Sequence, residues 1–382
     1  MVSTVIILGE HIQALGLTRQ AHSLGLMVFL AVRNWCSVAR FSNSVDRTFY
    51  YSDDDSLTRI LLDHRDINAL LLPTSDDLIE YLDNNRNVLE PFFIIGIPSK
   101  ECIRLFANKR NTYRFCEKEG IPHPKSYYPN SLEEAASIAE VIQFPVIIKP
   151  AVMYRFHALT KKKAILCHDK DELIRNLKAL NDRITVQELL IQEFLQGGAA
   201  SLYSYGTFAV NGVPKCWIMA NRIRQNPMDF GNSTTFAISC DIPDIEQSAQ
   251  KILRLTNYTG LAEVEFMYDA NSKTYKFLEI NTRAWKWHSI SNGSGFGFFS
   301  EMLRYHNGCP SEFQTNTKTI AWVEVLTDSF IILKEVIKGK MSFKKALASY
   351  RIPKTRAVWD KRDPVPAIMY LLLSPILFFK RH

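Results

Sequence analysis

Apolar residues in the first part of the chain form short continuous runs, separated by stretches with helical spacing. The runs occupy residues 2–8, 26–32, 67–72 and 92–97. Between the first two runs, residues 11–23 repeat apolar side chains every three or four positions, and Gly25 ends the pattern. Continuous runs of this length are typical of buried parallel strands. Residues 1–105 are therefore predicted to form an α/β domain.

The pattern changes after residues 121–124, a stiff stretch that contains two prolines. Beyond it, Asn211-Gly212 separates two apolar runs and indicates a β-hairpin. Helices are predicted at residues 171–180 and 245–255, and strands at residues 144–149, 191–195, 203–210, 215–220, 261–268 and 274–280. This mixture indicates an α+β region, and 382 residues are enough for two or three subdomains.

A second predicted hairpin carries the acidic residues of most interest. Residues 269–273 form its turn, so Glu265 falls opposite residues 277–279. Side chains alternate along a strand, which places Glu279 and Asn281 on one face. Neighbours across a strand pair lie about 5 Å apart. Two carboxylates at that distance repel each other, so the arrangement costs little only if a cation lies between them.

Two carboxylates and an amide oxygen are hard oxygen ligands of the kind that Mg²⁺ prefers, with water and phosphate filling its other positions. Arg283, two residues beyond Asn281, could hold a phosphate or acyl-phosphate oxygen. The alternative is a solvated hairpin that has Glu263, Glu265 and Glu279 on its wet face.

Composition narrows the range of functions. Hydrophobic residues make up 47% of the chain and charged residues 22%, which is ordinary for a folded globular protein. The formal charge of +7 suits an anionic ligand, a membrane surface or nucleic acid. The sequence has no recognisable nucleic-acid-binding motif, so nucleic acid is not the expected partner.

Cysteine and glycine spacings exclude other classes. The seven cysteines are odd in number and include no C-x-x-C pair, which favours buried thiols in a reducing cytosol over zinc or disulfide sites. The first ten residues resemble a strand rather than a secretion signal. Gly9 and Gly16 do not form a dinucleotide-binding fingerprint, which argues against a nicotinamide-dependent oxidoreductase. Residues 74–77 could line a crevice, but helix capping is the favoured interpretation.

The chain resembles the ATP-grasp superfamily over about residues 1–300, and within it the carboxylate–amine ligase branch that includes D-aspartate ligase. The matching pieces occur in family order. They are Asn-Lys-Arg at 108–110, Glu-Gly-Ile-Pro-His-Pro at 119–124, Phe-Pro-Val-Ile-Ile-Lys-Pro at 144–150, Gln-Glu-Phe-Leu-Gln-Gly at 192–197, residues 201–204 and 221–225, Glu265, and Leu-Glu-Ile-Asn-Thr-Arg at 278–283. Each piece alone is a weak signal, whereas their common order is specific.

This resemblance implies a three-part architecture. An N-terminal pre-ATP-grasp domain would occupy residues 1–105. The ATP-grasp fold would divide into a small subdomain with a phosphate lid at 106–195 and a subdomain with the metal site at 196–310. Residues 311–382 would form a C-terminal extension.

The resemblance also implies roles for individual residues. Lys109, Lys149 and Lys163 would contact ATP phosphates. Glu193 would accept a hydrogen bond from the adenine amino group, and the Leu195 backbone would lie at the ring edge. The metal set would be Glu265, Glu279 and Asn281, binding Mg²⁺ or Mn²⁺. Arg283 and Lys149 would be the catalytic cations, since phosphoryl transfer needs positive charge around the transferring oxygens.

The chain departs from the superfamily at the phosphate lid. Residues 151–163 contain no glycine. Arg155, His157 and Lys161–Lys163 could close over phosphates by charge, and a mobile basic loop is the alternative. Ala199-Ala200 stands where relatives often place an acidic residue near the ribose, so the ribose contact stays unassigned.

The implied activity is ATP-dependent amide formation through an acyl phosphate, with Arg222 and Arg224 as candidates for holding an anionic substrate. The acceptor carboxylate, small or lipid-linked, and the amine cannot be read from the sequence. Cell-envelope or polysaccharide precursors would fit, and a homodimer is compatible with the family. The alternative function is a nucleotide-binding regulatory protein that has lost catalysis.

The end of the chain adds one further hypothesis. Residues 367–379 are almost wholly apolar, with basic residues on both sides. Thirteen residues are too few to span a bilayer as a helix, which needs about 20. The segment is predicted either to pack on the core or to lie peripherally on an anionic membrane at its cytoplasmic face.

Overall fold

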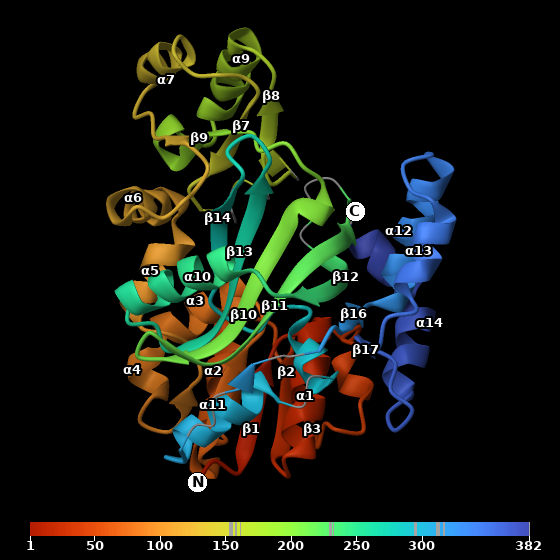
Figure 1. Cartoon of the computed structure of the whole chain (residues 1–382). Helices are drawn as coiled ribbons and strands as arrows, with labels where there is room; N and C mark the ends of the chain where they lie inside the picture. The colour runs from red at the N-terminus through yellow and green to blue at the C-terminus, as the bar shows by residue number, and fades with distance from the viewer. Residues whose placement is uncertain are drawn as a thin grey trace.

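The computed structural model describes residues 1–152, 156, 159–160, 162–228, 231, 233–293, 296–310, 314–315 and 318–381. Three β-sheets organise this mixed α/β chain. In Figure 1 the N-terminal sheet lies at the bottom, the largest sheet in the centre and a small sheet at the top.

The N-terminal sheet is wholly parallel, as the continuous apolar runs predict, with strand order β3-β2-β1-β4-β5. Its strands are β1 (Thr4–Leu8), β2 (Met27–Val32), β3 (Arg47–Tyr50), β4 (Ala69–Pro73) and β5 (Ile94–Ile95). The accompanying helices are α1 (Ile12–Ser23), α2 (Asp54–Leu62), α3 (Asp76–Asn84) and α4 (Arg86–Leu89). β3 escapes the sequence pattern because it is short and half polar, and β5 is shorter than the predicted run.

The small sheet is antiparallel, with order β6-β9-β7-β8. Its strands are β6 (Ser126–Tyr127), β7 (Val146–Pro150), β8 (Ile165–Cys167) and β9 (Leu189–Glu193). Helices α7 (Leu132–Ala139) and α9 (Lys170–Asn181) pack with it around one apolar cluster. Helices α5 (Lys100–Ala107) and α6 (Lys109–Glu119) lie between this sheet and the N-terminal sheet (Figure 1).

The large sheet has eight strands, in the order β14-β13-β10-β11-β12-β16-β17 with β15 beside β11. The strands are β10 (Leu202–Val210), β11 (Val213–Asn226), β12 (Ser233–Cys240), β13 (Gly260–Asp269), β14 (Thr274–Asn281), β15 (Gln314–Thr315), β16 (Ala321–Val323) and β17 (Lys354–Arg356). Helices α10 (Pro243–Leu255) and α11 (Phe298–His306) pack against it.

Both hairpins predicted in this sheet are present. β10 pairs with β11 across Asn211-Gly212, and both turn residues have positive φ. In the β13–β14 hairpin, Asp269 closes the turn by accepting hydrogen bonds from the Asn271 backbone and the Ser272 hydroxyl. This turn sets the register that the site depends on.

The C-terminal residues join the large sheet rather than standing apart, because β16 pairs with β12 and β17 pairs with β16. Helices α12 (Val325–Ile337), α13 (Phe343–Ser349) and α14 (Val365–Arg381) follow these strands. No helix in the described part of the chain is both long and apolar enough to cross a membrane. Residues 105, 195 and 310 are still only proposed domain limits.

A buried ion pair fastens the C-terminal helices to the large sheet. The Arg224 guanidinium donates two hydrogen bonds of 2.8 Å to the Asp328 carboxylate, and both side chains are almost fully buried. Thr235 and Tyr350 hydroxyls donate to the same carboxylate at 2.8 and 2.7 Å. Removing one member of such a pair leaves an uncompensated buried charge.

We therefore expect Asp328→Ala to lower the free energy of unfolding by about 3–5 kcal/mol, measured by denaturant titration. Asp54→Ala is the matched control, because its partner Arg33 and Asp54 itself are both exposed. Exposed pairs contribute at most about 1 kcal/mol. Equal, small effects of the two substitutions would contradict this role of the buried pair.

Candidate active site

The acidic residues of the β13–β14 hairpin gather as the register requires. Glu265 lies directly opposite Glu279, and Glu263 lies opposite Asn281. The Asn281 amide nitrogen donates to both Glu263 and Glu265, at 3.0 and 2.9 Å. Glu263 is buried and also accepts a 2.6 Å hydrogen bond from the Trp287 indole. The hairpin face is therefore acidic, with Glu263 buried and Glu265, Glu279 and Asn281 partly exposed.

Two basic side chains contact these carboxylates directly. Lys109, the first residue of α6, lies 2.6 Å from a Glu279 oxygen. Arg222 on β11 lies 2.5 Å from a Glu265 oxygen. The Arg222 side chain is buried, and its Nε has no hydrogen-bond partner among the described residues. Each carboxylate thus has a cation that comes from a different part of the fold.

Two further lysines add positive charge around Glu279. The charge of Lys109, followed by those of Lys163 and Lys149, holds the pKa of Glu279 well below its usual range. Burial by itself would lower the pKa of Lys109, but the neighbouring charges, that of Glu279 first, together with the hydrogen bond to Glu279 raise it. Glu279 is consequently a carboxylate that stays ionised under all ordinary conditions.

The environment has the opposite effect on Lys149, where β7 ends. Burial and the nearby charge of Lys109 lower the pKa of Lys149 to about 8. Its ammonium donates to the Gln192 side chain at 2.9 Å, a neutral partner. Burial also lowers the pKa of Lys163. Burial therefore disfavours the charged form of both lysines, and Lys149 donates to a neutral amide. An added anion would stabilise their charged form.

Glu193, at the end of β9, links the small sheet to the hairpin. Its carboxylate accepts a 2.9 Å hydrogen bond from the Lys125 backbone and forms an ion pair with Lys276 of β14. Leu195, two residues on, is buried. A backbone hydrogen bond of 2.7 Å from Phe277 to Pro122 runs beside this contact. Glu193 and Leu195 therefore lie where the small sheet meets β14.

Arg283 links the hairpin to the N-terminal domain. Its guanidinium donates to the Asp76 carboxylate at 2.7 and 3.3 Å. Asp76 lies in the first turn of α3, and Ser75 before it makes no side-chain cap. The favoured capping interpretation of residues 74–77 is thus wrong for Ser75, while Asp76 faces a residue of the candidate site.

The structure does not bring Arg224 to this site. Arg224 lies only two residues from Arg222, but register irregularities interrupt β11 between them. Its guanidinium is buried against Asp328 and packs over the Phe236 ring. The expectation that Arg224 holds a substrate is therefore not met, because its charge is already balanced inside the fold. Sequence spacing alone could not reveal a partner 104 residues away.

Sequence reasoning also missed three contributors. The sequence pattern assigns Glu263 only to a possible wet face, although its spacing of two from Glu265 places it on the same side of β13. Trp287 and Lys276 carry no sequence signal for their contacts. Of the predicted basic lid, Arg155, His157 and Lys161 lie outside the described residues, whereas Lys162 and Lys163 lie within them.

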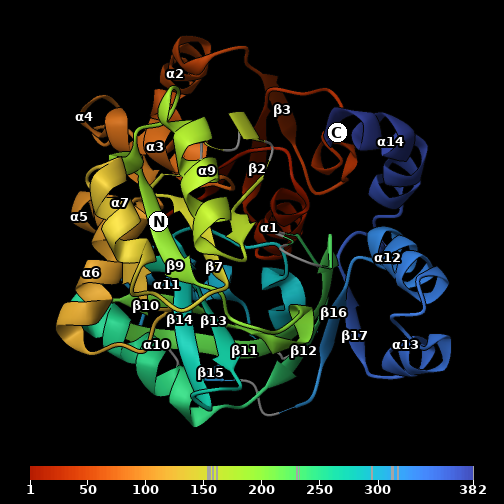
Figure 2. The ribbon, with the colours of Figure 1, turned by 90° about the horizontal axis from the view of Figure 1, so that it is seen from above.

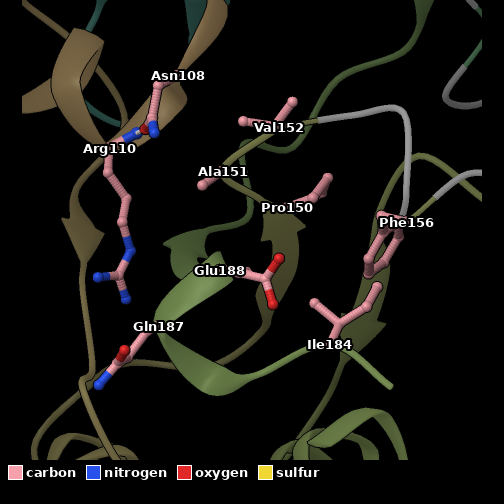
Figure 3. A pocket seen from close by; sticks show the side chains of 9 residues that line it. All are labelled: Asn108, Arg110, Pro150, Ala151, Val152, Phe156, Ile184, Gln187 and Glu188. Atoms are coloured by element: carbon pink, nitrogen blue, oxygen red, sulfur yellow. Dashed lines mark hydrogen bonds between the residues drawn. The ribbon is translucent and has the colours of Figure 1, made fainter.

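A separate cavity has a volume of about 140 Å³, and Figure 3 shows the side chains that line it. It is lined by Asn108, Arg110, Pro150, Ala151, Val152, Phe156, Ile184, Gln187 and Glu188. The predicted phosphate and metal residues do not line it, although Lys109 and Lys149 are chain neighbours of its walls. None of the candidate site residues therefore lines this cavity, which borders the end of β7 at Pro150.

The hairpin fits a hard divalent cation. In the described part of the chain, no three His, Cys, Asp or Glu side chains form a metal-binding group by themselves. Glu265 and Glu279 supply two carboxylates, and Asn281 adds an amide oxygen. So few protein ligands are usual for Mg²⁺ that is bound together with phosphates. The lysines near Glu279 provide the complementary charge for those phosphates.

The three-part fold, with a charged cluster between the small and large sheets, defines the ATP-grasp class. Residues 108–312 match the family model described as the carbamoyl-phosphate synthase L chain, ATP binding domain. The chain belongs to this ATP-grasp family. The match begins at Lys109's neighbour Asn108 and extends past Arg283, so it includes every predicted site residue.

A curated relative supports the ligase branch. The D-aspartate ligase of Enterococcus faecium is 23% identical over 224 residues, which cover 56% of this chain and 53% of that protein. Carbamoyl phosphate synthase large chains also match, over smaller shares of their length. The chain thus spans about half or less of the length of the curated relatives it matches.

Solved structures share the fold. The N5-carboxyaminoimidazole synthetase of Staphylococcus aureus, complexed with ADP, has a TM-score of 0.68 at 14% identity, covering 88% of this chain and 86% of that chain. A second is the biotin carboxylase domain dimer of the Hydrogenobacter thermophilus 2-oxoglutarate carboxylase with MgADP, ADP and bicarbonate. Its TM-score is 0.63 at 15% identity, with coverage of 81% and 71%.

The depressed pKa of Lys149 predicts that this residue destabilises the protein without ligand. Lys149→Met should raise the free energy of unfolding by about 1–3 kcal/mol, because the buried charge is replaced by an apolar side chain of similar length. Denaturant titration of the ligand-free protein measures the change. Lys178→Met, an exposed site on α9, is the control and should have little effect. A less stable Lys149→Met protein would contradict the claim that the buried charge of Lys149 destabilises the ligand-free protein.

Proposed function

We propose that the chain is an ATP-dependent carboxylate–amine ligase, which forms an amide through an acyl phosphate and converts MgATP to ADP and phosphate. The observation that carries the proposal is the convergence of Lys109, Lys149, Lys163 and Arg222 on the paired carboxylates of one hairpin. Such a cluster can hold a polyphosphate together with its divalent cation. Family membership and the ligases among the relatives support the same activity.

Glu265, Glu279 and Asn281 are the proposed ligands of Mg²⁺, with Mn²⁺ as a substitute. Lys109 and Lys149 would move from protein partners to phosphate oxygens when the nucleotide enters, and Lys163 would cover them from the lid. Glu193 is proposed to accept the adenine amino group, with the Leu195 backbone at the ring edge. Their position where the small sheet meets β14 supports this placement.

The proposed chemistry has two steps. An acceptor carboxylate oxygen attacks the γ-phosphorus, the bond to the bridging oxygen breaks, and ADP leaves. An amine then attacks the acyl carbon of the mixed anhydride, loses a proton and expels phosphate. Lys149 and Arg283 are the proposed catalytic cations, because charge on the transferring oxygens is the main requirement. Exclusion of water from the anhydride does the rest.

Arg222 is the proposed substrate cation, since its Nε is buried without a hydrogen-bond partner among the described residues. The acceptor is a carboxylate, either a small molecule or one carried on a lipid, in a cell-envelope or polysaccharide precursor. We place the protein in the cytoplasm and propose a homodimer, the state in which one solved neighbour was crystallised. Nucleic acid is not a proposed partner.

A nucleotide-binding regulatory protein without catalysis is the second candidate. The observation that favours it is the glycine-free segment 151–163 where relatives carry their lid. Binding of ATP without any ADP formation, across acceptors and amines of every class offered, would support this candidate over the ligase.

Glu279→Gln tests the metal assignment. Loss of this charge should reduce acceptor-dependent ADP release on the order of 10²-fold or more, because the metal ligand and the partner of Lys109 disappear together. Coupled measurement of ADP, with circular dichroism to verify the fold, gives the comparison. Glu117→Gln, on the same helix as Lys109 but bonded to Tyr128, should retain turnover. Turnover kept by Glu279→Gln would remove the metal site from the proposal.

The pKa of about 8 at Lys149 makes nucleotide binding depend on pH. Below pH 8 the ammonium is protonated and attracts phosphate. As the pH rises through about 8, the ammonium loses its proton. The affinity for MgATP should therefore fall over roughly pH 7.5 to 9.5, the range in which this lysine titrates. Calorimetric titration of MgATP measures this. In Lys149→Arg the guanidinium stays charged, so its affinity should change less over the same interval. Parallel pH profiles for the two proteins would contradict the assignment.

A further inference from the structure

The formal charge of the chain is concentrated in its last part. Residues 325–382 contain twelve Lys and Arg against four Asp and Glu, a formal charge of +8. The whole chain carries +7, so residues 1–324 together carry −1. Three of the four acidic side chains, those of Asp328, Glu335 and Asp363, are buried. The surface of this part is therefore even more basic than its composition.

Exposed apolar side chains are concentrated in the same part. Twelve of the 25 large hydrophobic residues that are exposed in the described chain fall within residues 325–376. On α14 they are Val365, Ile368, Leu371, Leu372 and Ile376. At 100° per residue these five share one side of the helix, opposite the buried Tyr370 and Leu373. The outward side of α14 is thus apolar, the reverse of an ordinary surface helix.

Helices α12 and α13 extend this arrangement. Phe330, Leu333 and Ile337 form an exposed apolar stripe along α12, with Lys334 and Lys338 next to it. On α13, the exposed Phe343 and Leu347 lie beside Lys344 and Lys345. Both views place α12, α13 and α14 along one side of the molecule (Figures 1 and 2). We call the exposed residues of these three helices the C-terminal helical surface.

An apolar cavity joins two of these helices. It has a volume of about 220 Å³ and lies between α12 and α14. Val325, Leu371 and Trp359, all exposed, line it together with Tyr370, and Arg356 stands at its wall. The start of α12 and the outward side of α14 therefore meet at one apolar hollow. Trp and Tyr near such an edge are typical of side chains that lie at a lipid–water interface.

We propose that the C-terminal helical surface docks the protein on an anionic lipid bilayer, without crossing it. Apolar side chains would enter the headgroup region, while the surrounding lysines contact anionic headgroups. The positive charge of this surface favours an anionic bilayer over a second copy of the chain, because a second copy would bring two positive surfaces into contact. Helix α14 can pack on the core and contact a membrane at the same time. Tyr370 and Leu373 are buried on its inner side, whereas Ile368 and Leu372 are exposed on its outer side. The inference does not depend on the ligase activity.

Co-sedimentation of the full chain with lipid vesicles tests the proposal. The protein should bind vesicles of phosphatidylcholine and phosphatidylglycerol. It should bind at least about tenfold more weakly to phosphatidylcholine alone, because its basic residues are attracted to anionic headgroups. Added salt should weaken the binding. No binding to the anionic vesicles would overturn the proposal.

Paired variants identify the surface. Lys344→Glu with Lys345→Glu, and separately Ile368→Ser with Leu372→Ser, should each lower anionic vesicle binding at least about tenfold. The charge control is Lys118→Glu with Lys178→Glu, and the apolar control is Val88→Ser with Val141→Ser, all exposed residues elsewhere. Thermal unfolding verifies the fold, and the charge pair keeps the test valid if the apolar pair does not fold. Variants that bind like their controls would contradict the proposal.

Sedimentation velocity without lipid tests whether a second copy of the chain covers this surface instead of a bilayer. If a second copy covers this surface, Ile368→Ser with Leu372→Ser should convert a dimer to a monomer while vesicle binding is absent. That outcome would overturn membrane docking. An unchanged sedimentation coefficient, together with lost vesicle binding, supports it.

Discussion

Three carboxylates on one face of a partly buried hairpin set the constraint that the rest of this structure satisfies. Glu263, Glu265 and Glu279 repel each other, and burial with the charge of Glu265 raises the pKa of Glu263 to about 7. The hairpin is stable only when cations or donors meet these oxygens. Lys109, Arg222 and the Asn281 amide do so in the ligand-free protein. In the proposed enzyme, a metal ion and a nucleotide take over part of that task.

The same requirement for charge balance draws the parts of the fold together. Lys109 comes from α6, and Arg222 comes from β11, which β10 separates from β13 in the large sheet. Arg283 reaches the N-terminal domain through Asp76. At the other end of β14, Lys276 pairs with Glu193 of the small sheet. Contacts to charged groups of one hairpin therefore connect all three sheets, and binding of a ligand there can change how the sheets are held.

Local pattern was sufficient for four strands of the parallel sheet, all but β3, and for the hairpin. Continuous apolar runs and a polar turn fix the positions of the strands, and alternation fixes their faces. The facing pair Glu265 and Glu279 followed from that register. Contacts between distant segments could not be predicted in the same way. Arg224 finds Asp328 only because β16 adds to the large sheet and places α12 beside β11. The outward apolar side of α14 likewise required knowledge of which side is buried.

The central claim is that an acceptor carboxylate is activated as an acyl phosphate. The most direct measurement supplies a carboxylate acceptor labelled with ¹⁸O, together with MgATP and an amine, and determines the isotope content of the released phosphate by mass spectrometry. Pools of amino acids and carboxylated sugars identify an acceptor first. An acyl-phosphate intermediate should leave one ¹⁸O in each phosphate, carried over from the acceptor when the amine breaks the anhydride. Phosphate without the label, formed by attack of water on ATP, would contradict this claim.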